Sequence, residues 1–233
     1  MGLAHQGLIM QPQQLASRVG AFALISAFAA PPTLLAQLPG TPVLQNAWAT
    51  PGIVVALDVG GGSGTSRGST FAGAAAWAPG TARFQLSAGG GMNSGTGTGS
   101  RAVYGVRLAA PLKEMMGGNL GFGAFIGAGG GASSVKDSLR ANAIAPVGLA
   151  VGYRRAVGST GRGFSVYADP NYQYQSGLKN KKGYFRVGFG LDAGITSRFG
   201  ATVGVESGAS AAPGFVGPHG STFGLGASMK LGR

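Results

Sequence analysis

Residues 222–231 of this chain read Thr-Phe-Gly-Leu-Gly-Ala-Ser-Met-Lys-Leu (TFGLGASMKL), a strict alternation of two kinds of side chain. One set of positions holds Phe223, Leu225, Ala227, Met229 and Leu231, and the other holds small or polar residues. Successive side chains of a β-strand point to opposite faces, so this pattern predicts a strand between two different environments. The alternation recurs from residue 52 onward, with Gly- and Ser-rich breaks between the segments.

Ten such segments can be counted, near 52–60, 70–78, 81–89, 100–110, 119–128, 143–153, 163–170, 183–192, 199–206 and 222–231. Each is about as long as a tilted strand must be to cross a bilayer. The breaks alternate between long ones, at 61–69, 90–99, 129–142, 171–182 and 207–221, and mostly shorter ones, at 79–80, 111–118, 154–162 and 193–198. The sequence therefore predicts an all-β fold, an antiparallel up-and-down transmembrane β-barrel with about ten strands, eight being possible.

Composition bears on which face of the strands points inward. Of the 233 residues, 46 are glycine and only 10% are charged, whereas an ordinary soluble domain has about 25% charged residues. A soluble periplasmic or secreted barrel that binds an apolar ligand inside is the alternative, and its polar faces should be crowded with Lys and Glu. The polar faces here carry mainly Gly, Ser, Ala and Thr, which favours the membrane barrel. Aromatic residues near strand ends fit interfacial girdles: Phe71, Trp77, Tyr153, Phe164, Phe185 and Phe223.

The N-terminal region predicts export to the bacterial outer membrane through a cleaved signal. Arg18 precedes an uncharged run over 19–30, which is long enough for a signal-peptide core and too short for a membrane span. Cleavage after Ala36 or Ala29 fits the run, and translation from Met10 rather than Met1 would give a more ordinary signal. We therefore divide the chain into a signal peptide (1–36), a short N-terminal segment (37–51) and the barrel (52–233).

These features resemble small bacterial outer-membrane β-barrels, the opacity-protein and OmpA-like barrel group. The resemblance covers about residues 50–233 and rests on the signal, the alternation, the loop rhythm and the amphipathic last strand. It implies outer-membrane lipid as the surroundings and the barrel-assembly machinery as a partner. Those families usually end on an aromatic residue, where this chain has Leu231. The expected role is structural, surface-interacting or porin-like, with weak passage of small solutes.

Charged side chains on the predicted inner face form the most informative group. These are Asp58, Arg83, Arg101, Arg107, Asp169, Arg186, Asp192, Glu206 and Lys230. They predict either salt bridges that plug a small barrel or a cation-lined passage that prefers anions. A second basic set lies in or beside the long breaks, where it can contact phosphates of lipopolysaccharide or simply keep the loops soluble: Arg67, Lys136, Arg140, Lys179, Lys181 and Lys182.

No motif predicts catalysis, a cofactor or a metal site. The net charge of +12 is scattered in ones and twos, which argues against nucleic-acid binding, and the chain has no cysteine. His5 lies in the predicted signal, which leaves His219, in a long break, as the histidine of the predicted mature chain. A triad of His219 with Ser207 and Glu206 would make the protein a barrel enzyme acting on lipid, which is the less favoured alternative. The glycine pattern at 188–193 matches a loose dinucleotide fingerprint, but it lies within an alternating segment rather than at the start of a helix.

Overall fold

The computed structural model describes residues 46–62, 68–95, 99–135, 138–158, 162–177, 181–209 and 220–232. Ten strands account for most of them: β1 (Gly52–Gly62), β2 (Gly68–Ala78), β3 (Gln85–Gly95), β4 (Gly99–Met115), β5 (Leu120–Val135), β6 (Ser138–Val157), β7 (Arg162–Gly177), β8 (Lys181–Gly194), β9 (Phe199–Gly208) and β10 (Thr222–Leu231). A short 3-10 turn, η2 (Met116–Gly118), joins β4 to β5. The predicted signal peptide lies outside the described residues.

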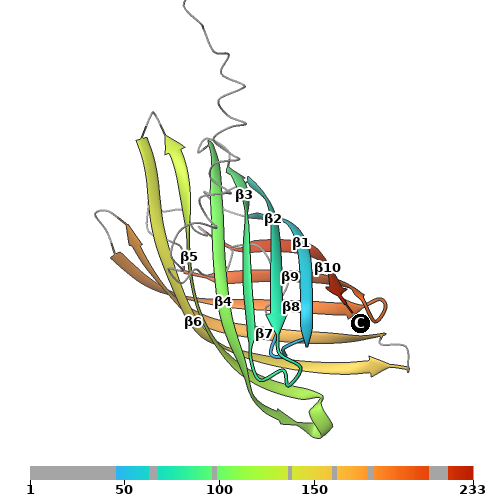
Figure 1. Ribbon diagram of the computed structural model, residues 1–233. Coiled ribbons are helices and arrows are strands. Elements are labelled where there is room, and N and C mark those ends of the chain that lie inside the picture. The colour runs from blue at the N-terminus through green and yellow to red at the C-terminus, as the bar shows by residue number, and fades with distance from the viewer. Residues whose placement is uncertain are drawn as a thin grey trace, which may run out of the picture. The chain divides into compact units, whose positions relative to one another are not determined.

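The ten strands close into one antiparallel barrel (Figure 1). Each strand pairs with the next along the chain, and β1 pairs with β10, so Leu57 lies between Gly73 of β2 and Ala227 of β10. The predicted fold class and the count of ten strands are therefore confirmed. Closure leaves no unpaired sheet edge among these strands.

The two faces of the wall differ sharply in chemistry. Every strand contributes at least one large apolar side chain that is exposed on the outside, and the side chains of Leu57 and Phe223 are each 60% exposed. The neighbouring positions point inward, where Asp58 is 1% and Arg186 0% exposed. The inner face thus carries the buried charges, mixed with some apolar side chains such as Val103 and Phe125, whereas the outer face is apolar. The soluble alternative would instead need a polar outer face.

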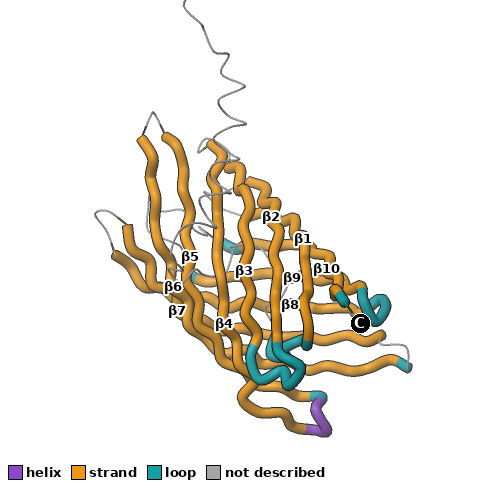
Figure 2. Tube along the Cα trace, viewed as in Figure 1, coloured by secondary structure: helices purple, strands orange, loops and turns teal. Residues whose placement is uncertain are grey.

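Three of the long breaks are not loops. Strand covers most of 90–99, 129–142 and 171–182, because β3 to β8 extend in paired hairpins well past the alternating segments. These stretches read as loops because they are rich in Gly, Ser and Asn, yet backbone pairing across a hairpin needs no apolar side chain. Figure 2 shows the short turns gathered mainly at one end of the barrel, which we call the short-turn mouth. No helix in the described part of the chain is long and apolar enough to span a membrane.

Candidate functional site

A stripe of polar side chains on β7 lines the barrel interior. Asp169, Asn171, Gln173 and Gln175 occupy alternate positions, and all four are buried. They share one face because the strand places every second side chain inward. Glycine on β8 makes room for the stripe: Gly188 is the register partner of Asp169, and a Cβ added there would collide with the Asp169 carboxylate.

The stripe connects to β4 through Arg107. The Arg107 Nη1 atom lies 3.8 Å from Asp169 Oδ2, and its guanidinium carbon lies 3.7 Å from the centre of the Phe125 ring. Both charged side chains are almost fully buried. A buried charge requires an opposite charge or another strong partner, and here Arg107 has a carboxylate and an aromatic face.

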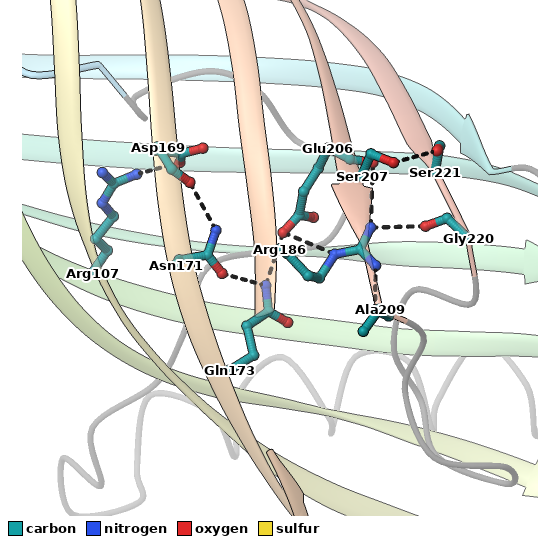
Figure 3. Close-up of polar contacts among 10 residues, drawn as sticks. All are labelled: Arg107, Asp169, Asn171, Gln173, Arg186, Glu206, Ser207, Ala209, Gly220 and Ser221. Carbon is teal, nitrogen blue, oxygen red and sulfur yellow. Dashed lines mark hydrogen bonds and ion pairs between the residues drawn. The ribbon is translucent and has the colours of Figure 1, made fainter. Parts of the chain in front are cut away.

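At its other end the stripe connects to β8 and β9 (Figure 3). Asn171 Nδ2 donates to the carbonyl of Asp169 at 3.0 Å, and Gln173 Nε2 donates to Asn171 Oδ1 at 2.9 Å and to Glu206 Oε1 at 2.8 Å. The same Glu206 oxygen lies 3.2 Å from Arg186 Nε. A continuous polar network, which we call the lumen network, therefore runs across the interior from Arg107 to Arg186.

Arg186 also fixes the backbone that follows β9 and precedes β10. Its Nη1 donates to the carbonyl of Ala209 at 2.9 Å, and its Nη2 donates to the carbonyls of Gly220 at 2.8 Å and Glu206 at 3.3 Å. One buried guanidinium thus uses the forked donors of arginine to hold three carbonyls and a carboxylate. This arrangement joins both ends of the β9–β10 connection to the lumen network.

A second polar cluster surrounds Asp192 near the short-turn mouth. Thr202 Oγ1 donates to Asp192 Oδ1 at 2.6 Å, and Asn46 Nδ2 and Ser165 Oγ donate to Asp192 Oδ2 at 2.8 and 3.1 Å. Three neutral donors satisfy this carboxylate in place of a cation.

The predicted inner charges fall into four groups. Asp58, Arg107, Asp169, Arg186 and Glu206 are buried inside, while Asp192 and Lys230 have the inward register and are partly buried. The prediction for Arg83 is wrong: this residue is exposed in the turn before β3, because β3 begins only at Gln85. The side chain of Arg101 lies outside the described part.

The predicted outer basic set is only partly described. Lys181 and Lys182 begin β8 and are both exposed. Arg67, Lys136 and Lys179 lie outside the described residues, as does the side chain of Arg140.

The suggested triad does not assemble from the residues that are described. Glu206 points inward to Arg186, whereas Ser207 is exposed and its Oγ lies 2.9 Å from Ser221 Oγ. Adjacent residues of a strand face opposite sides, so these two side chains cannot serve one site. His219 lies outside the described residues. The described part of the chain also contains no group of His, Cys, Asp or Glu residues that could hold a metal ion.

Sequence reasoning missed the amides of the lumen network and two residues before β1. Asn171, Gln173 and Gln175 fall in a stretch that we assigned to a loop, although they alternate with Tyr172 and Tyr174, which are exposed. That alternation was a usable signal. Asn46 and Trp48 carried no periodic signal, since they precede the first strand.

Comparison with protein-family models and with curated proteins finds no match. Among solved structures, the chain is similar to outer membrane phospholipase A from Escherichia coli. The TM-score is 0.34 for an active-site mutant and 0.33 for a second structure of that protein, with 11% sequence identity in both cases. Each alignment covers 83% of this chain and 95% of the other.

Proposed function

We propose that this protein is an outer-membrane β-barrel with a structural and surface-presenting role and with no catalytic chemistry. The observation that carries the proposal is the inverted distribution of side chains. Large apolar residues are exposed around the whole wall, and charged residues are buried inside it. In water this arrangement would expose a very large apolar surface, whereas in a bilayer the same surface faces lipid.

The strand lengths support the presenting role. β9 and β10 have 10 residues each, which is about the length that crosses a bilayer. β4 has 17 residues, β5 16, β6 20 and β7 16, so this side of the wall is longer than a membrane requires. We propose that the additional length stands above the outer leaflet as a surface for interaction. The short turns, the start of β1 and the end of β10 would then lie on the periplasmic side.

The lumen network favours a closed barrel over a conducting one. Arg107 of β4 is paired with Asp169 of β7 across the interior, Arg186 of β8 is paired with Glu206 of the neighbouring β9, and the amides between them are buried. A solute would have to separate these pairs and leave charges buried without partners, which is costly. Weak passage of small solutes is therefore the second role within this proposal, and it requires the network to rearrange.

Lipopolysaccharide and the barrel-assembly machinery remain the proposed partners. Lys181 and Lys182 are exposed at the start of β8, and Lys181 has the register of the outer face, which it shares with the exposed Tyr172 and Tyr174 of the neighbouring β7. An ammonium group on the same face as aromatic rings suits a phosphorylated lipid surface. Membership of the opacity-protein and OmpA-like group stays a prediction.

Heat-modifiability in the isolated outer-membrane fraction tests the proposal. We expect the unboiled protein to migrate differently from the boiled protein on a denaturing gel, because a closed barrel resists unfolding by detergent. Purified protein in planar bilayers should then show little or no conductance. Recovery of the chain in the soluble periplasm without detergent would contradict the membrane location, and large stable conductance would contradict the closed lumen.

A further inference from the structure

Residues 46–48, just before β1, lie inside the barrel wall instead of outside it. Ala47 is 4% and Trp48 7% exposed, and both pack with Ala150 of β6. Gly123 of β5 also faces this segment, since a Cβ added there would lie 3.3 Å from the carbonyl oxygen of Ala47. Residues 46–48 are therefore part of the interior at the short-turn mouth.

The two ends of this segment are attached to opposite walls. Asn46 Nδ2 donates to Asp192 Oδ2 of β8 at 2.8 Å, and the Thr50 amide donates to Gln85 Oε1 of β3 at 3.2 Å. In the closed ring β3 and β8 are separated by the same number of strands in either direction. Residues 46–48 form a bend in which the Trp48 amide donates to Asn46 Oδ1 at 3.3 Å. Residues 46–50, together with the side chains of Asn46 and Gln85, therefore bridge the mouth between β8 and β3.

Trp48 occupies a notch that two glycines create. Gly121 of β5 and Gly152 of β6 are register partners, and a Cβ added to either would lie 2.6 Å from the indole ring. The guanidinium carbon of Arg154 lies 4.8 Å from the centre of that ring. Arg154 is itself held by the carbonyl of Gly118 at 2.9 Å and by Glu114 at 3.2 Å.

We propose that residues 46–50 form a plug that closes the short-turn mouth, and that the plug opens when the Trp48 side chain leaves its notch. Two features suit withdrawal. The Trp48 Nε1 atom is buried with no hydrogen-bond acceptor among the described residues, so leaving the notch would restore a hydrogen bond with water. The Arg154–Glu114 pair beside the ring is 43% and 45% exposed, so water and salt can loosen it. That this mouth faces the periplasm rests on the proposed function, but the plug itself does not.

Cysteine accessibility tests the plug directly, because the chain has no cysteine of its own. Ala150→Cys places one thiol beneath Trp48, where the parent residue is 3% exposed. We expect a small cationic thiol reagent to label Ala150→Cys slowly in the folded barrel. Adding Trp48→Ala should raise the labelling rate by about tenfold or more. Adding Trp77→Ala, which removes an outward tryptophan instead, should leave the rate unchanged. Equal rates with and without Trp48 would overturn the proposal.

A second measurement avoids any disturbance from the introduced thiol. The chain has two tryptophans, so Trp77→Phe leaves Trp48 as the only indole fluorophore. Its emission should resist acrylamide, and Gly121→Ala should expel the ring and at least double the quenching constant. Gly73→Ala is the matched control, because its added Cβ would have no neighbour closer than 3.5 Å. Easy quenching of Trp48 in the folded Trp77→Phe protein would also overturn the plug. Heat-modifiability of every variant reports separately on the membrane barrel.

Discussion

Replacing Arg186 with alanine should destabilise the barrel more than any other single change in the lumen network. The Arg186 side chain is fully buried, lies 3.2 Å from Glu206 and donates to the carbonyls of Glu206, Ala209 and Gly220. Its removal leaves the Glu206 carboxylate buried, with the amide of Gln173 as a hydrogen-bond donor but with no cation in place of Arg186. Breaking a buried ion pair from one side costs about 3–5 kcal/mol. We expect the free energy of unfolding to fall within this range and not further, because the carbonyls that Arg186 held near the rim can accept hydrogen bonds from water instead.

The assay is equilibrium unfolding in urea after refolding into detergent, followed by the gel mobility difference between folded and unfolded barrel. Arg198→Ala is the matched control, because Arg198 is exposed in the turn between β8 and β9 and its removal should change the free energy of unfolding by less than about 0.5 kcal/mol. The double variant Arg186→Met/Glu206→Met should lose less free energy of unfolding than Arg186→Ala alone, because neither charge of the pair remains buried without its partner. A loss below about 1 kcal/mol for Arg186→Ala, equal to that of Arg198→Ala, would refute the reasoning.

Three further substitutions test other parts of the structure by the same gel assay of unfolding in urea, with the barrel refolded into lipid vesicles for Leu57→Lys and its control. Leu57→Lys places a charge on the outer face at a 60% exposed position in the middle of β1, so the free energy of unfolding should fall by about 2–4 kcal/mol in a lipid bilayer. Thr81→Lys in the exposed turn before β3 is the control. Equal effects of the two changes would argue against burial of this face in lipid. Gly91→Ala would bring a Cβ against the Phe71 carbonyl and within 2.6 Å of Ala72 Cβ, so we expect the free energy of unfolding to fall by about 1–3 kcal/mol. The neighbouring Gly90→Ala, whose nearest contact would be 3.5 Å, should leave it nearly unchanged. A larger loss for Gly90→Ala than for Gly91→Ala would contradict the assignment of these residues to opposite faces. Glu114→Gln breaks a pair that is 43% and 45% exposed, so the free energy of unfolding should fall by less than about 1 kcal/mol; a larger fall would mean that the pair holds more of the fold than its exposure indicates.

The strands were predictable because their signal is local. Alternation along 222–231 assigns each side chain to a face without any knowledge of the partner strand. For the same reason Asp58, Arg107 and Asp169 could be placed inside. Arg83 was misplaced because the alternation of 81–89 was extended into a turn, and the tight connection before Gln85 breaks the register.

Pairing across the lumen was not predictable in the same way. Which carboxylate meets Arg186 depends on the stagger of β8 against β9 and on the curvature of the wall, and neither is encoded in the alternation. Asn46 reaches Asp192 from a segment without periodicity. Long-range contacts of this kind follow only from the closed structure.

The glycine content has a packing explanation in this barrel. In composition alone, 46 glycines suggest a low-complexity chain. In the structure, Gly188 and Gly190 of β8 leave space for Asp169 and Tyr167 of β7, and Gly121 and Gly152 leave space for Trp48. A ten-stranded barrel has a narrow interior, so long polar side chains fit only if they lie flat across a neighbouring strand that lacks a side chain there. Glycine on one strand and the charge or ring on the next therefore form a single unit. A substitution of either member should disturb the lumen network or the plug, even where the glycine itself makes no polar contact.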